Sequence, residues 1–226
     1  DHPGVAAGVS TGVKWLYGIN RQQGNTYFPY IGKSIDTAYT GDGYYIVSGR
    51  NSYDTLSHNY VKVSKLGKDG LPVWEKELSE QELNGLRFEP ASITSQADGG
   101  CTVFSYVYNN DSSNSNNSKT AAFRLDGSGN ILWQRAYSGS KSEEVYYSIN
   151  TADNGYLITG YATHVVGPPA GSHIDSLDDG NLFIAKIAAN GDQLWRKEYG
   201  GSRDDAGLKI ISLTNGSYLV LGATSS

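Results

Sequence analysis

Short runs of apolar residues recur along the chain, and Gly, Asn or Asp bounds each of them. The clearest runs are residues 145–151 (VYYSINT), 156–162 (YLITGYA), 182–188 (LFIAKIA) and 193–199 (QLWRKEY). Their length and their content of β-branched and aromatic residues are typical of strands. Tight turns at 153–155 and 190–192 separate the first pair and the last pair. The pattern predicts four antiparallel strands, which together form one blade of a β-propeller.

The tryptophans show that this unit is repeated. Trp15, Trp74, Trp133 and Trp195 are the only ones, at spacings of 59, 59 and 62 residues. A fixed period of this size indicates a repeat architecture. Three of them have a glycine four positions earlier (Gly70, Gly129 and Gly191), whereas Trp15 has Gly12 three positions earlier. We expect Trp74, Trp133 and Trp195 to be largely buried between blades, because large aromatic residues in one register fill such spaces.

Two further copies fit the same template. Strands are predicted at 34–39, 44–50, 60–66 and 73–78, and again at 91–95, 101–108, 120–126 and 131–137. After the clearest copy only two strands follow, at 206–213 and 218–223, while residues 13–19 read as a fourth strand and residues 2–8 occupy the place of a third. The two ends of the chain could therefore build one blade.

The predicted fold is one all-β domain over residues 1–226, a propeller of four-stranded antiparallel blades. Its blades are expected at 34–78, 91–137 and 145–199, with a closing blade from 1–19 and 206–226. Four blades are the favoured number, since joining both termini protects the strand edges. The alternative is part of a larger ring, completed by another copy or by further sequence.

Three segments carry a family resemblance: KLGKDGLPVW from Lys65, RLDGSGNILW from Arg124 and KIAANGDQLW from Lys186. They resemble the repeats of exported bacterial β-propeller proteins, and they are similar to the tryptophan motif of quinoprotein-like propellers. The resemblance implies a bacterial protein that is secreted or displayed on the cell surface. It implies no cofactor, because no residues match a quinone site.

Composition removes some classes of function. The chain has 18 Lys and Arg against 23 Asp and Glu, a formal charge of −5 without a basic stripe, so we expect no nucleic-acid partner. No apolar run reaches the length of a transmembrane segment, about 18 residues. The sequence starts at Asp1 without an apolar leader, which predicts that any signal peptide is already removed or omitted. Cys101 lies in an apolar run and is predicted to be a small buried residue.

Two groups of residues invite a chemical interpretation. One loop carries imidazoles and carboxylates that could bind calcium or a transition metal, although their spacing matches no known motif: His164, His173, Asp175, Asp178 and Asp179. Lys65, Arg124 and Lys186 each precede a tryptophan by nine residues. They could form a basic ring for an anion, but we expect buried stems with paired or solvated charges.

Function is predicted from the lengths of the connections. In a four-stranded meander, short turns leave one face of the ring and long, varied loops leave the other, where recognition usually occurs. The apolar anchors in these loops are Tyr27, Phe28, Tyr30, Leu86 and Phe88. The favoured function is a non-catalytic module that binds protein or carbohydrate. The alternatives are a carbohydrate hydrolase or lyase with loop carboxylates such as Glu143 and Asp204, and a structural unit of a surface assembly or oligomer.

Overall fold

The computed structural model describes residues 36–50, 60–79, 87–108, 118–137, 142–163 and 180–225. In these ranges the regular structure consists of antiparallel strands, so the predicted all-β class is confirmed. None of the described segments forms a helix that is long and apolar enough to span a membrane.

The strands form three complete four-stranded sheets and one two-stranded sheet. Blade 1 contains β1 (Asp36–Thr40), β2 (Gly43–Arg50), β3 (Tyr60–Gly67) and β4 (Pro72–Ser79). Blade 2 contains β5 (Arg87–Ser95), β6 (Cys101–Tyr108), β7 (Ser118–Leu125) and β8 (Ile131–Ala136). Blade 3 contains β9 (Ser142–Asn150), β10 (Tyr156–Thr163), β11 (Asn181–Ile187) and β12 (Gln193–Tyr199). The half-blade contains β13 (Asp205–Ser212) and β14 (Tyr218–Thr224).

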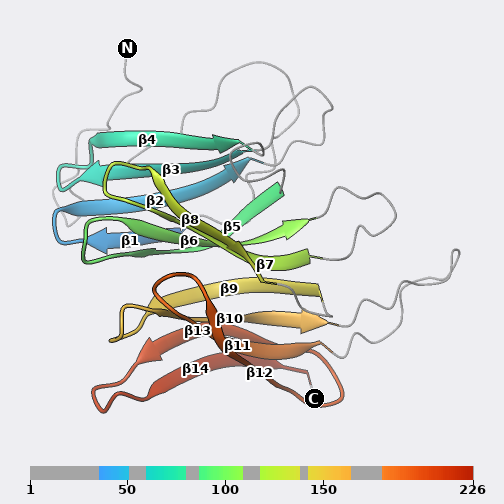
Figure 1. Ribbon diagram of the computed structural model, residues 1–226. Coiled ribbons are helices and arrows are strands. Elements are labelled where there is room, and N and C mark those ends of the chain that lie inside the picture. Colours follow the sequence, from blue (N-terminus) through green and yellow to red (C-terminus); the bar gives the residue numbers. More distant parts are fainter. Residues whose placement is uncertain are drawn as a thin grey trace, which may run out of the picture.

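The sheets stack face to face with their first strands side by side (Figure 1). β1 contacts β5, β5 contacts β9, and β9 contacts β13. Sequential four-stranded meanders arranged in this way define a β-propeller, as predicted. Among the described strands, β1 and β13 share no substantial contact, so this part of the chain forms an open arc. The number of blades in the ring stays a prediction.

Two apolar layers hold the three complete blades together. Neighbouring residues of β6 belong to different layers: Val103 is buried in the layer against blade 1, and Phe104 in the layer against blade 3. This division follows from the period of two along a strand, which turns successive side chains to opposite faces. Because blade 2 lies between two neighbours, β6 is apolar on both faces, and its sequence is a nearly continuous apolar run. Cys101 is fully buried in the first layer, as expected.

Most predicted strand boundaries lie within two residues of the observed ones. The larger differences are at β5 and β9, which begin at Arg87 and Ser142, four and three residues earlier than predicted. In β5 a bulge between Pro90 and Ser92 lets pairing with β6 continue past a proline. A similar irregularity in β10, between Thr159 and Gly160, shifts the pairing with β9.

The connections divide the propeller into two ends. At the turn end, short turns join the first strand to the second and the third to the fourth in every blade (Figure 1). At the opposite end, called the loop end here, the second strand is joined to the third and each blade to the next. The glycines of the third-to-fourth turns have the left-handed backbone that this residue tolerates best, with φ of 80° at Gly70, 84° at Gly129 and 87° at Gly191.

Candidate functional site

Two of the repeated tryptophans dock on the following blade. The indole Nε1 of Trp74 donates to the carbonyl oxygen of Gly127 at 2.9 Å, and that of Trp133 donates to Ala189 at 3.2 Å. A Cβ atom on Gly129 would lie 3.3 Å from the ring of Trp74, and one on Gly191 would lie 3.0 Å from the ring of Trp133. Each glycine is therefore needed both for its backbone conformation and for the ring that covers it.

The tryptophan prediction is correct in register but needs correction in burial. Trp74 and Trp133 are partly buried and pack against the two apolar layers. Trp195 is 44% exposed, and among the described residues none accepts a hydrogen bond from its indole. The half-blade has only β13 and β14 in the described chain, so the turn on which Trp195 would dock lies outside it.

The three basic residues that precede the tryptophans form ion pairs at the turn end. Each cation on a third strand faces an aspartate in the first turn of its own blade: Lys65 with Asp42 at 3.7 Å, Arg124 with Asp98, and Lys186 with Asp153 at 2.7 Å. The three cationic side chains are each 12% exposed, as expected for buried stems. The Lys186 ammonium and the Thr151 hydroxyl hold the pKa of Asp153 well below its usual range.

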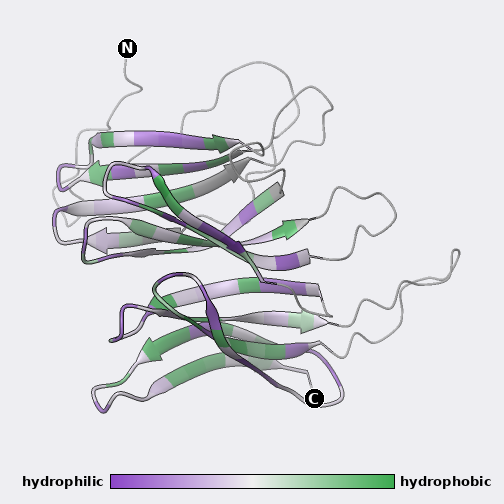
Figure 2. Ribbon diagram, in the orientation of Figure 1, coloured by the Kyte–Doolittle hydropathy of each residue, from purple (hydrophilic) through white to green (hydrophobic). Residues whose placement is uncertain are grey.

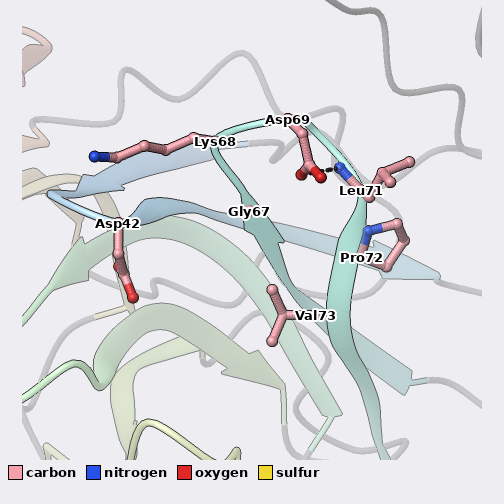
Figure 3. A pocket seen from close by; sticks show the side chains of 7 residues that line it. All are labelled: Asp42, Gly67, Lys68, Asp69, Leu71, Pro72 and Val73. Atoms are coloured by element: carbon pink, nitrogen blue, oxygen red, sulfur yellow. Dashed lines mark hydrogen bonds between the residues drawn. The ribbon is translucent and has the colours of Figure 1, made fainter.

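The turn end also carries a shallow hollow of about 550 Å³ at the β3–β4 turn (Figure 3). Its lining residues are Asp42, Gly67, Lys68, Asp69, Leu71, Pro72 and Val73. Its two carboxylates already have partners: Asp69 accepts from the amide of Leu71 at 3.0 Å, and Asp42 accepts from Thr40 at 2.5 Å besides its pairing with Lys65. The hollow therefore offers few polar groups to a ligand.

A cluster of charged residues lies near the loop end of blade 3. Arg196 of β12 places Nη2 2.9 Å from a carboxylate oxygen of Glu143, the second residue of β9, and Nη1 2.5 Å from Glu198. The guanidinium also lies over the ring of Phe183, 5.1 Å from its centroid. Asn181 donates to Glu198 at 3.5 Å. One arginine thus holds two carboxylates against an aromatic ring in the core.

Glu143 is the acid with the most buried environment in this cluster. Its side chain is 5% exposed. Burial raises the pKa of the Glu143 carboxyl, while the Arg196 guanidinium and the Thr120 hydroxyl act in the opposite direction. Nη2 of Arg196 lies close to Glu143 but is not aligned for a hydrogen bond. As a result, neither Nη2 nor Nε of Arg196 has a hydrogen-bond partner. The arrangement stabilises a buried charge and leaves part of the guanidinium unsatisfied.

Tyrosines of the second strands hold two further acids near the loop end. Tyr106 of β6 donates to Glu89 at 2.5 Å, and Tyr161, at the equivalent position of β10, donates to Asp204 at 2.9 Å. Asp204 also accepts from the amide of Gly180 at 3.3 Å. These hydrogen bonds fix carboxylates at the base of the loops.

Most predicted ligand-binding and metal-ligating residues fall outside the described residues: Tyr27, Phe28, Tyr30, Leu86, His164, His173, Asp175, Asp178 and Asp179. The exception is Phe88, which is 7% exposed and packs edge-on against Phe123 with ring centroids 5.7 Å apart. Phe88 is therefore part of the core, because β5 extends further than predicted and carries this position into the sheet. In the described part of the chain, no group of three or more His, Cys, Asp or Glu side chains could hold a metal ion.

Sequence reasoning missed the role of Arg196 and Glu198. They lie between Trp195 and Tyr199 in a strand that reads as a repeat element, and nothing in its local pattern separates a charge facing the preceding blade from one facing solvent. Glu143, the ion-pair partner of Arg196, lies 53 residues earlier, on the opposite edge strand of the same sheet. Glu143 is expected from the sequence as a loop carboxylate, and the structure places it, buried, in β9.

No protein-family model and no curated protein sequence matches the chain. Solved structures similar to it include the parainfluenza virus 5 hemagglutinin-neuraminidase ectodomain, at 10% identity and a TM-score of 0.48 over 75% of this chain and 45% of that one. A variant of Synechocystis apocarotenoid oxygenase is similar at 10% identity and a TM-score of 0.45, over 84% of this chain and 50% of that one. The chain thus spans about half the length of each. These likenesses are too weak to carry an argument about function.

Proposed function

We propose that the chain is a non-catalytic binding module that recognises a protein or a carbohydrate at its loop end. The observation that supports this is the distribution of the longest connections: those over 51–59, 80–86, 109–117 and 164–180 all leave from the loop end, whereas the turns at the other end are short. Variable loops on a rigid scaffold are the usual place of recognition. The tethered acids Glu89 and Asp204 add acceptors for sugar hydroxyls or for cationic side chains.

The turn end is a poor alternative for recognition. The three cations of its third strands are already paired with aspartates of the same blade, so an anion there would have to displace an existing partner. The exported bacterial repeats that the sequence resembles favour a location outside the cell, on the surface or secreted. The proposed ligand is accordingly an extracellular protein or glycan.

Binding can be tested with the labelled full chain on a glycan array and on a panel of extracellular matrix proteins. The variant Tyr27→Ala/Phe28→Ala/Tyr30→Ala removes three candidate anchors, and Leu71→Ser/Val73→Ser removes two exposed apolar residues at the turn end. For any captured probe we expect the first variant to weaken binding by roughly tenfold or more, since central aromatic anchors contribute about 2 kcal/mol or more. Equal losses in both variants, with both folded, would contradict the proposal.

A carbohydrate hydrolase is the second candidate, and one observation favours it. Glu143 has a raised pKa and Glu198 shares its arginine, so two carboxylates with different environments lie around one guanidinium. The deep burial of Glu143 argues against contact with a substrate, and for this reason catalysis ranks second. Release of reducing sugar from a polysaccharide panel, abolished by Glu143→Gln without loss of folding, would reverse this order.

A further inference from the structure

The half-blade has the largest group of exposed apolar residues in the described chain. Leu208 and Ile211 of β13 are both 45% exposed, and Leu219 and Leu221 of β14 are 55% and 61% exposed. Figure 2 shows apolar colouring along both strands. β14 pairs only with β13 among the described strands, so one edge of it is open to a further strand. Exposed apolar surface beside an open edge is typical of a strand-addition site.

We infer that residues 1–19 of the same chain add to β14 as the missing third and fourth strands. The repeat geometry identifies what must cover Trp195. Trp74 and Trp133 each rest on a glycine of the next third-to-fourth turn, and each donates to the carbonyl oxygen two residues before that glycine. In the N-terminal segment Gly12 provides such a glycine, and Ser10 lies two residues before it. Gly12 is thereby placed under the Trp195 ring, with the Ser10 carbonyl as the acceptor for its indole.

The charge pattern of the half-blade fits this segment in particular. Blades 1 to 3 pair a turn aspartate with a cation on the third strand, five residues before the turn glycine and nine before the tryptophan. In the half-blade the aspartate is replaced by Asn215, which keeps the turn hydrogen bond to the amide of Ser217 at 3.0 Å but carries no charge. In the N-terminal segment, the residue nine positions before Trp15 is Ala6, and the residue five positions before Gly12 is Ala7. Both spacings give an uncharged alanine. The half-blade therefore lacks the turn aspartate, and the N-terminal segment lacks the cation that would pair with it.

The pairing register follows from the complete blades. The third-strand cations lie opposite Tyr45, Thr102 and Leu157, each of which is equivalent to Leu219 in β14. Leu219 is therefore expected opposite Ala6 or Ala7.

The same chain is the favoured source because the segment is tethered. Residues 20–35 can span roughly 55 Å when extended, whereas a compact chain of this length is roughly 45 Å across. A tethered segment that can reach its site acts at an effective concentration in the millimolar range. Strand addition at β14 does not require blade 1 to contact the half-blade.

Cysteine pairs in the full chain test the register. Ala6→Cys/Leu219→Cys and Ala7→Cys/Leu219→Cys place thiols on directly opposite residues, about 4.5–5.5 Å apart at Cβ. The matched control is Ala6→Cys/Leu132→Cys, in which Leu132 is 53% exposed on blade 2. The native Cys101 can remain, because it is fully buried and burial raises the pKa of its thiol.

After mild oxidation we expect most of one Leu219 pair to form an intramolecular disulfide, seen as a monomer that loses its free thiols, with little in the control. Gly12→Ala should reduce this yield, whereas Gly18→Ala should not. No cross-link above the control, or a cross-link found only in dimers, would overturn the inference.

A second measurement needs no cysteine. Ala6→Lys and Ala7→Lys, each combined with Asn215→Asp, should recreate the pair that Lys186 and Asp153 form in blade 3. For one of the two double variants we expect a higher melting temperature than the sum of its single changes predicts. Strict additivity in both would contradict the register, even if all variants fold normally.

Discussion

β10 and β14 are the same strand in sequence but not in environment. Both are second strands that follow a turn with glycine, and they read YLITG and YLVLG. Tyr156 and Leu157 of β10 are 0% and 3% exposed, whereas Tyr218 and Leu219 of β14 are 39% and 55% exposed. β10 lies between β9 and β11 in a complete sheet, while β14 has one described neighbour. Local sequence is enough to form the strand, but its burial depends on the strands and blades around it.

The largest expected effect concerns the charged cluster, which the half-blade lacks. Arg196→Met should cost roughly 3–5 kcal/mol, because Glu143 is left as a buried charge without its partner. Burial then raises the pKa of Glu143 further. An acid whose pKa is raised in the folded state destabilises the fold increasingly as pH rises from the unfolded pKa to the folded pKa. The free energy of unfolding lost in Arg196→Met should therefore be smaller near pH 5 than near pH 8. Chemical denaturation at both values measures this.

The matched control is Arg135→Met, which breaks a pair with Asp192 at 3.7 Å whose two side chains are 45% and 60% exposed. We expect less than about 1 kcal/mol there and little dependence on pH. Equal costs for the two arginines would mean that the Glu143 cluster is solvated.

The next largest effect is expected at the tryptophans. Trp133 packs on the turn of the following blade, whereas the turn that would cover Trp195 lies outside the described residues. Trp133→Ala should lower the free energy of unfolding by roughly 2–4 kcal/mol, somewhat less than a fully buried tryptophan, because it removes a ring packed on Gly191. If residues 1–19 cover Trp195, Trp195→Ala should cost about 2 kcal/mol in the full chain. A cost near zero would mean that the indole is exposed in solution.

A smaller effect is expected when the same substitution, Ile→Val, removes one methylene from blade 3 and from the half-blade. Ile158→Val in β10 should cost about 0.5–1.5 kcal/mol, since the side chain is 1% exposed. Ile211→Val in β13 should lie within about 0.5 kcal/mol of zero, because that side chain is 45% exposed. Urea titration of both variants at one temperature decides the comparison. A larger cost at Ile211 would show that the half-blade is as well packed as blade 3.

The smallest effect concerns the turns. Asp153 has a lowered pKa, so its stabilisation is present above the unfolded value, about 4, and is lost as pH falls below it. Asp153→Asn should cost less than about 1 kcal/mol near neutral pH and make the melting temperature less sensitive to acid. Asn215→Asp should not stabilise the native chain, because no cation faces this turn among the described residues. Melting curves between pH 3 and 7 measure both.

The sequence alone determined the repeat and its strands, because these depend on local chemistry. Glycines and Asx residues fix the turns wherever the backbone needs positive φ or a side-chain hydrogen bond, and the alternation of apolar residues fixes which runs become strands. The tryptophan spacing was sufficient to place three complete blades and the two strands of a fourth. The cations nine residues before Trp74, Trp133 and Trp195 were expected to have buried stems with paired or solvated charges, and the structure shows all three paired.

Tertiary structure decided which faces of these strands are covered. Phe88 became a core residue because β5 continues past Pro90 by means of a bulge, which the local sequence did not indicate. Glu143, Arg196 and Glu198 met because two edge strands of one sheet present them to the same side, and 53 residues separate the first pair. Trp195 has a turn glycine and a cation at the same spacings as its docked counterparts, yet its environment differs. Burial is a property of neighbours brought together by the fold, so a repeat can predict its own strands but not the partner of its last one.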